Sequence, residues 1–483
     1  MISSKKRSLP EAKATEDTQD DVDDDDDDVC KKVKSTAAAS INQYTGWKVP
    51  SHNYTIPTIS IGGDGSADDN ESNTITPESF YNEYIRQRKP VVLRTTDNNN
   101  NNISSSSLLS DLSKLTKWKD INYLKSQVDS KHIVMVEQRS SSSSSSFGNG
   151  YEIPMTFSKF VNLITSKNDD RHYLTTQDVH SNPDNGRPDL MSPLMKYLQH
   201  DFPLQPQIIG NLIPQNINLW MGGNSSSTTT TEGISSGLHH DYHDNLYIVL
   251  KGQKKFRLYS PHDTERMYTR GSLVKVHPNG RICYKGEETT AYGADLKSDM
   301  AARAAKRKED AERMLEEAER AVEEGVEGAE QMLEKAEVEL EEAMDDIIDA
   351  EMDDDEEEDD DSKDDEKECV YETFVDERKR VVDKTVVDPN NFSKIKPHLL
   401  DDTSVLKESY PNFLDATAAY CTVQEGDILY LPASWFHEVT SYGGQKDGHL
   451  AMNYWFHPPD GESFEHPYST DFWPNDYKDR FGK

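Results

Sequence analysis

The sequence predicts a mainly β fold with flanking helices, a sandwich or barrel interrupted by an acidic helical insertion. From Ile217 onward, short apolar or alternating runs recur with turn residues between them, which is typical of β-sandwiches and barrels. Between about residues 295 and 365, small and apolar residues recur at steps of three and four, which predicts helix. The expected strands are Ile217–Met221, Asn245–Leu250, Lys254–Tyr259, Val274–Val276, Ala419–Val423, Asp427–Leu431 and Leu450–Phe456.

The chain carries far more acid than base, and the excess is concentrated in two blocks. Of 483 residues, 89 are Asp or Glu and 53 are Lys or Arg, and the acidic blocks are Asp20–Asp28 and Glu309–Asp365. Nucleic-acid binding depends on Lys and Arg contacts to phosphates, so we expect no direct nucleic-acid binding. Acidic runs are usually solvated, but they can attract basic protein partners, and the second block is the candidate for this role.

Cysteine spacing and hydropathy indicate an intracellular protein. The four cysteines form no CxxC pair, and we interpret them as reduced thiols rather than as a disulfide framework or a zinc site. The sequence contains no apolar segment typical of a signal peptide, and no apolar run approaches the ~18 residues of a transmembrane helix. We therefore expect no membrane association. The basic clusters Lys5–Arg7 and Lys31–Lys34 leave a nuclear location open beside a cytoplasmic one.

Residues 1–75 are expected to be a disordered acidic tail, and residues 76–294 to be the first part of the folded domain. The tail lacks apolar periodicity, although Trp47 and Tyr54 are candidates for holding part of it against the core. In the folded part, the pattern predicts helices at Glu78–Gln87, Thr156–Thr165 and Met191–His200, strands at Pro90–Arg94 and Tyr173–Thr176, and polar loop insertions at Asn98–Asn102 and Ser140–Ser146.

Residues 295–365 are expected to form the acidic, coiled-coil-like insertion, after which the domain resumes over residues 366–483. Gly325 and Gly328 weaken a continuous helix and predict a bend. The run Asp353–Asp361 is purely acidic and should be unstructured. Two interpretations of the insertion stay open: a solvated helix without a specific role, and a docking arm for a basic partner.

A pair of residues in the segment Gly237–Pro261 points to metal chemistry. His239 and Asp241 are two positions apart in an expected strand, so they point to the same side and can converge on one metal ion. One imidazole and one carboxylate do not complete a site, and the candidate for the third ligand is His437. Two histidines and one carboxylate on one side of the ion leave three positions open, as in non-haem Fe(II) oxygenases.

Two other ligand sets are compatible with the spacing. His240 could pair with Asp244, although it falls on the opposite face of the strand from His239. Glu438, next to His437, makes a set of three histidines and one glutamate conceivable. The His-x-Asp pattern favours the first assignment over both.

Several motifs, in order along the chain, resemble the jumonji-C family of 2-oxoglutarate-dependent oxygenases, and within it the branch of small hydroxylases. The resemblance covers roughly residues 77–290 and 367–460. The motifs that carry it are Pro77–Phe80 with Lys89–Arg94, Asn218–Gly222, His239-x-Asp241, Asn245–Tyr247, Gly252-x-Lys254, Pro432-x-x-Trp435-x-His437 and Asn453–Trp455.

The resemblance implies a double-stranded β-helix, the jelly roll of the cupin type. It also implies that His239, Asp241 and His437 bind Fe(II), with 2-oxoglutarate and O₂ as cosubstrates. At the positions that match the family, Lys254 would bind the distal carboxylate of 2-oxoglutarate, with a hydroxyl from Ser236. The amides of Asn245 and Asn453 would line the cosubstrate pocket.

The function implied by the resemblance is hydroxylation of a side chain in a protein substrate, with lysine as one candidate. An alternative within the same chemistry is N-methyl-lysine demethylation. An alternative from another class is a non-catalytic cupin-type binding protein with an acidic interaction arm.

Overall fold

The computed structural model describes most of the chain apart from several polar and acidic stretches, and the helices in this described part include none that is both long and apolar enough to cross a membrane. The described residues are 40–61, 75–95, 107–139, 151–166, 169, 171–182, 186–223, 233–352, 389–443 and 448–482. The segment 1–39, the loops Asn98–Asn102 and Ser140–Ser146, and the acidic run Asp353–Asp361 lie outside them.

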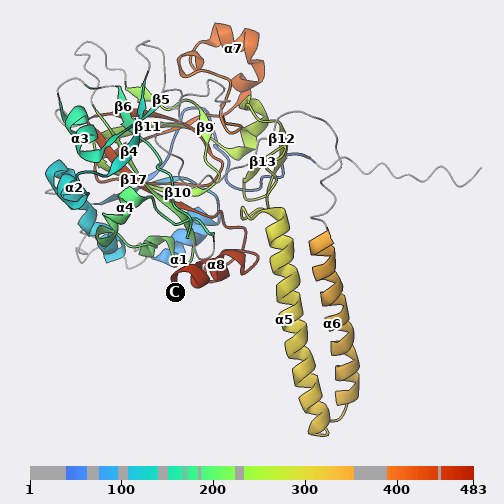
Figure 1. Ribbon diagram of the computed structural model, residues 1–483. Coiled ribbons are helices and arrows are strands. Elements are labelled where there is room, and N and C mark those ends of the chain that lie inside the picture. Colours follow the sequence, from blue (N-terminus) through green and yellow to red (C-terminus); the bar gives the residue numbers. More distant parts are fainter. Residues whose placement is uncertain are drawn as a thin grey trace, which may run out of the picture. The chain divides into compact units, whose positions relative to one another are not determined.

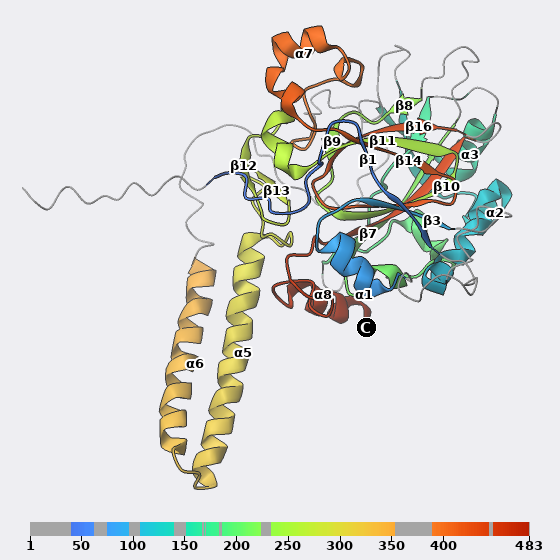
Figure 2. The same cartoon turned by 180° about the vertical axis from the view of Figure 1, so that it is seen from behind.

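Two sheets form separate layers of the fold (Figures 1 and 2). Among the described residues, the larger sheet has nine strands. In sequence order, these are β2 (Thr58–Ile61), β3 (Val91–Thr95), β4 (Ile133–Gln138), β5 (Tyr151–Thr156), β6 (His172–Leu174), β7 (Pro214–Gly222), β10 (Asp244–Lys251), β15 (Ile428–Leu431) and β17 (His449–Phe456). Their spatial order is β2-β3-β15-β10-β17-β7-β6-β4-β5.

The smaller sheet carries most of the residues that the sequence singles out. Among the described residues it contains β1 (Tyr54–Thr55), β8 (Ile234–Ser235), β9 (His239–His240), β11 (Gln253–Tyr259), β14 (Ala419–Gln424) and β16 (Phe436–Tyr442). Their order is β1-β14-β11-β16-β8, with β9 also paired to β16. A separate hairpin is formed by β12 (Leu273–Val276) and β13 (Ile282–Tyr284). The predicted jelly roll with flanking helices is thereby confirmed.

The central strand β10 is buried on both faces, which explains its continuous apolar run. Successive side chains of a strand point to opposite faces of the sheet. Leu246 and Ile248 pack into the core that the larger sheet shares with the helices, whereas Tyr247 and Val249 pack into the core between the two sheets. The helices outside the insertion are α1 (Pro77–Phe80), α2 (Ile121–Gln127), α3 (Phe157–Thr165), α4 (Pro193–Lys196), α7 (Thr403–Ser409) and α8 (Phe472–Phe481).

Short π-helical and 3₁₀-helical segments join these elements. A π-helix, η1 (Tyr81–Ile85), continues directly from α1. The 3₁₀ segments are η3 (Ser107–Lys119), η4 (Gln199–Asp201), η5 (Gln207–Ile209), η6 (Pro261–Arg266), η7 (Pro397–Leu399) and η8 (Pro411–Asp415). The predicted helix at Met191–His200 is too long, because α4 ends at Lys196 and only η4 follows. Asp201 accepts hydrogen bonds from Trp118 and Tyr123, contacts that no local pattern contains.

Residues 40–61 belong to the fold, and the prediction of a disordered tail is wrong for this stretch. Strand β1 pairs in parallel with β14, and β2 pairs in parallel with β3. The ring of Trp47 stacks on Trp435, with 5.8 Å between the centroids. The strands are only two and four residues long, too short to show periodicity in the sequence.

The insertion folds into two helices that run side by side (Figure 1). Helix α5 spans Leu296–Glu323 and helix α6 spans Ala329–Met352. The chain reverses between them, where Gly325 and Gly328 have φ angles of +69° and +85°. These angles favour glycine, so the bend predicted at this pair of residues is explained by their backbone conformation.

A seam of small side chains and one bridging arginine hold the two helices together. Arg307 of α5 donates to Glu339, Glu342 and Asp346 of α6 at 3.1, 2.8 and 2.5 Å. The buried alanines recur every seven residues, at Ala304, Ala311 and Ala318 on α5 and at Ala329, Ala336 and Ala343 on α6. The two helices therefore pack against each other through their own alanines and ion pairs. Binding of a basic partner to the acidic outer surface of the pair stays a prediction.

A buried ion pair joins distant parts of the chain at the start of β10. Arg88 donates to the two carboxylate oxygens of Asp244 at 2.8 and 2.5 Å, and both side chains are almost fully buried. Asp244 also accepts from the Tyr430 hydroxyl at 2.6 Å and from the backbone N–H of Ala433 at 2.9 Å. Because each carboxylate oxygen accepts two hydrogen bonds, the charge is fully compensated inside the core.

We expect Arg88→Met to lower the free energy of unfolding by about 3–5 kcal/mol, because Asp244 would remain buried without its cation. Urea unfolding followed by circular dichroism measures this loss. The control is Lys119→Ala, which removes a 2.8 Å ion pair to Glu425 whose side chains are 30% and 38% exposed. This control should cost at most ~1 kcal/mol. Similar small losses for both variants would contradict a structural role for the buried pair.

Candidate functional site

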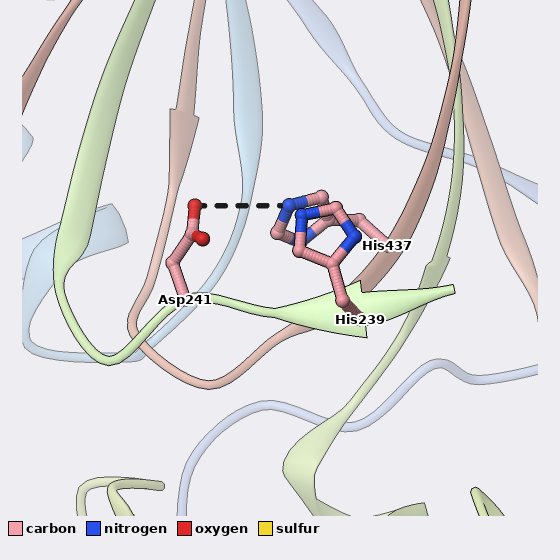
Figure 3. Close-up of side chains that lie close together, drawn as sticks. All are labelled: His239, Asp241 and His437. Atoms are coloured by element: carbon pink, nitrogen blue, oxygen red, sulfur yellow. Dashed lines mark ion pairs between the residues drawn. The ribbon is translucent and has the colours of Figure 1, made fainter. Parts of the chain in front are cut away.

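His239, Asp241 and His437 come together at one end of the barrel (Figure 3). His239 on β9 lies directly opposite His437 on β16 in an antiparallel pair. Asp241 follows His239 by two residues, and its carboxylate points toward the imidazoles. One ligand atom from each residue lies within 4.8 Å of the other two, and Asp241 Oδ2 is 3.7 Å from His437 Nε2. Within the described residues, this is the group with the spacing of a metal site.

Both histidines are oriented by backbone carbonyls. His239 Nδ1 lies 3.0 Å from the Gly237 carbonyl oxygen, and His437 Nδ1 lies 2.8 Å from that of Trp435. A carbonyl only accepts hydrogen bonds, so each Nδ1 carries a proton, and in the neutral imidazole that binds a metal the lone pair is on Nε2. Burial and the neighbouring His437 lower the pKa of His239 to about 4. The neutral imidazoles and the carboxylate are the ligand types that suit Fe(II), and they fit the expected triad.

The competing ligand sets do not form. The His240 side chain is buried on the far side of the strand, where its Nε2 lies 2.9 Å from the Tyr284 hydroxyl. Asp244, its possible partner, is fully used by Arg88 and the other donors described above. Glu438 alternates with His437 along β16 and bonds to the Thr440 hydroxyl at 3.1 Å, so it points away from the triad.

Lys254 occupies the interior of the same barrel. It lies on β11 directly opposite Ser441 on β16, and its side chain is 1% exposed. Its ammonium donates to the Ser441 hydroxyl at 2.6 Å and to the Tyr173 hydroxyl at 3.4 Å. No carboxylate of the described residues pairs with it, and burial lowers the pKa of Lys254 to about 7. A buried amine without a counter-charge fits a place for the distal carboxylate of a 2-oxo acid.

Ser441, rather than Ser236, supplies the hydroxyl next to Lys254. The Ser236 hydroxyl accepts from the backbone N–H of Val439 at 3.1 Å and donates to the Gly237 carbonyl at 3.1 Å. It therefore ties the strand before the metal ligands to β16. The sequence contained a signal for Ser441, because it lies four residues after His437 and therefore on the same face of β16.

His449 is a further polar group at this end of the barrel that sequence reasoning missed. Its ring lies 5.3 Å from that of Tyr173. Burial, and to a smaller extent the charge of Lys254, lowers the pKa of His449. Its Nε2 is buried and has no hydrogen-bond partner among the described residues. Gly222 leaves room for the ring, because a Cβ there would come within 2.5 Å of it.

Asn245 and Asn453 contact each other next to the triad. The Asn453 amide donates to the Asn245 side-chain oxygen at 3.0 Å, and the Asn245 amide lies 3.4 Å from Asp241 Oδ2. The Asn453 oxygen accepts from Trp220 Nε1 at 2.8 Å. This chain of hydrogen bonds links β7 and β17 to Asp241, a metal-ligand candidate, and the role of both asparagines in the cosubstrate pocket stays a prediction.

Comparison with known proteins identifies the family. The model of the cupin-like domain matches residues 77–462. The chain is 31% identical over 469 residues to JmjC domain-containing protein 4 of Schizosaccharomyces pombe, a match that covers 89% of this chain and 90% of that protein.

Two further relatives match over shorter stretches. Human bifunctional peptidase and (3S)-lysyl hydroxylase JMJD7 is 39% identical over 71 residues, which is 15% of this chain and 21% of that protein. Lysine-specific demethylase JMJ32 of Arabidopsis thaliana is 22% identical over 244 residues, 50% of this chain and 42% of that protein. The family model and the long match to the yeast protein show that this chain belongs to the cupin-like jumonji-C family.

Proposed function

We propose that this protein is an Fe(II)- and 2-oxoglutarate-dependent oxygenase that hydroxylates a protein side chain, with lysine as the first candidate. The observation that carries the proposal is the presence of two sites in one barrel. These are a triad with its ligand atoms within 4.8 Å and a buried lysine that pairs with no acid in the described part of the chain. Either site alone has ordinary structural explanations, whereas together they match the needs of a chelated 2-oxo acid on a metal.

The residues of the chain have separate roles in this proposal. His239, Asp241 and His437 would hold Fe(II) on one side and leave positions for cosubstrates on the other. Lys254, with the Ser441 hydroxyl, would bind and orient the distal carboxylate of 2-oxoglutarate. The chemistry supplied there would be activation of O₂ coupled to decarboxylation of 2-oxoglutarate to succinate. The apolar core between the sheets excludes water from the rest of the barrel.

The names of two relatives support lysine but differ on the reaction. One is called a lysyl hydroxylase and the other a lysine-specific demethylase. Mass spectrometry of lysine and N-methyl-lysine peptides, incubated with the iron-loaded protein, 2-oxoglutarate and O₂, separates the outcomes. Hydroxylation adds one oxygen, demethylation removes a methyl group, and a non-catalytic binding protein changes neither. We expect the added oxygen.

We expect His239→Ala, Asp241→Ala and His437→Ala each to weaken Mn(II) binding by at least ~100-fold, because loss of even a supporting contact around a metal ligand typically costs 10–100-fold. Isothermal titration calorimetry with Mn(II) in place of Fe(II) measures the affinity. The matched control is His172→Ala, which removes another His–Asp contact, 2.9 Å from Asp169. An equal loss in the control, or wild-type affinity in all three triad variants, would rule out the metal site.

We expect the affinity for 2-oxoglutarate to fall as the pH rises above about 7. The pKa of Lys254 is lowered to about 7 by burial in the free protein, and a bound carboxylate would raise it again. The cationic form of Lys254, which would bind the carboxylate, predominates below pH 7 and is lost above it. The affinity for 2-oxoglutarate should therefore fall about tenfold per pH unit above pH 7. Calorimetric titrations of the Mn(II)-loaded protein between pH 6 and 9 test this.

The control for this pH dependence is Lys254→Met, which should bind weakly and with no dependence on pH in this range. Constant affinity of the wild type from pH 6 to 9 would contradict the assignment of Lys254 to the cosubstrate carboxylate. The triad variants serve as a second control, because they should lose affinity without changing the pH at which it declines.

A further inference from the structure

A second buried cation lies beside the metal loop, and no acid of the described residues pairs with it. Arg281 is 8% exposed. Its Nε donates to the Thr289 hydroxyl at 2.8 Å, and its Nη1 donates to the Tyr242 carbonyl at 2.7 Å. Tyr242 directly follows Asp241, so the guanidinium is hydrogen-bonded to the backbone of the loop that carries this metal-ligand candidate. Its remaining nitrogen, Nη2, has no hydrogen bond to the described part of the protein.

The contrast with Arg88 shows what is missing at Arg281. Both guanidiniums are buried, but Arg88 has a bidentate carboxylate, and Asp244 raises its pKa despite burial. Burial lowers the pKa of Arg281, and the groups that oppose this effect are weaker. A buried charge without a partner is unfavourable. A ligand of opposite charge that binds to Arg281 would remove this cost, which gives a reason for the fold to keep the arginine.

The nearest acid is held elsewhere. Glu287 accepts from the Tyr242 hydroxyl at 3.1 Å and from the Asn390 amide at 2.7 Å. The Arg281 guanidinium lies over the Tyr242 ring, 5.1 Å from its centroid. Tyr242 therefore contacts Arg281 through its ring and Glu287 through its hydroxyl. Glu287 therefore moderates the charge of Arg281 without forming an ion pair with it.

Beside Thr289 and Cys283, the neighbours of Arg281 include two imidazole rings. Its charge contributes to lowering the pKa of His243 and of His457, which places both imidazoles close to it. His243 stacks against Trp455, with 5.8 Å between centroids, and His457 stacks against Trp473. The surroundings offer aromatic surface and one positive charge, a combination suited to a carboxylate and unfavourable to a second cation.

We propose that Arg281 binds a carboxylate of the protein substrate, and that the preferred substrate carries an Asp or Glu close to the residue that is oxidised. The proposal rests on the oxygenase function proposed above and specifies its substrate class. Arg281 donates to the carbonyl of Tyr242, the residue after Asp241, so the bound carboxylate would lie next to the loop that carries the triad. An extended chain advances about 3.3 Å per residue, so a carboxylate held next to this loop belongs to a residue within about four positions of the target.

The test is binding of two pools of fluorescent lysine-centred peptides to the full-length protein loaded with Mn(II) and 2-oxoglutarate. One pool carries Asp or Glu within four positions of the lysine, and the other carries Asn or Gln at the same positions. Fluorescence anisotropy should show that the acidic pool binds about tenfold more tightly or better, as for a desolvated charge pair. Arg281→Gln should abolish this difference, and Arg281→Lys should retain part of it.

The matched control is Arg257→Gln, which removes the same charge from an arginine that pairs with Asp401, an acid with an 84% exposed side chain. It should preserve the preference for the acidic pool. Equal binding of the two pools by the wild type would overturn the proposal. So would a preference that survives Arg281→Gln in a variant with normal thermal unfolding. A failure of the oxygenase proposal is distinguishable, because it would appear as absent binding of Mn(II) and 2-oxoglutarate before any peptide is added.

Discussion

The ion pair between Arg88 and Asp244 is the constraint on which the candidate site depends. Asp244 lies three residues after Asp241 and begins β10, while its other donors, Tyr430 and the backbone of Ala433, lie in and just after β15. The loop that leads to His437 is thus pinned to the loop that carries Asp241. These two loops belong to parts of the sequence separated by the helical insertion. One buried carboxylate therefore aligns both halves of the metal triad, and the chain between them is free to vary.

The register of β16 then distributes the chemistry along the barrel. One strand carries His437 opposite His239 and, four residues later, Ser441 opposite Lys254. Four residues of strand span about 13 Å, so β16 places the triad and Lys254 at successive positions along the same barrel. On the larger sheet, the Asn453 amide donates to Asn245, whose own amide lies 3.4 Å from Asp241 Oδ2. Elsewhere between the sheets the side chains are apolar, so the polar groups stand out as a site.

Sequence reasoning found the residues whose spacing is local and missed those that depend on tertiary contacts. The His-x-Asp pair, the apolar run of β10 and the glycines of the helical turn were all visible as short-range patterns. Ser441 was missed in favour of Ser236 because the family position was followed instead of the face of the strand. The strands within residues 40–61 and the burial of Arg88 and Arg281 could not be predicted, because their partners lie far away in sequence. Isolated arginines and two-residue strands carry no periodic signal.

The most direct test of the central claim is whether the triad and Lys254 act as one site. Mn(II) and 2-oxoglutarate should bind cooperatively, since the 2-oxo acid would contact both the metal and Lys254. Calorimetric titration of each ligand with and without the other measures this coupling. Mn(II) should increase the affinity for 2-oxoglutarate, and 2-oxoglutarate should increase the affinity for Mn(II) by the same factor, as linkage requires. His437→Ala or Lys254→Met should remove this coupling. Independent binding of the two ligands to the wild-type protein would contradict a shared oxygenase site.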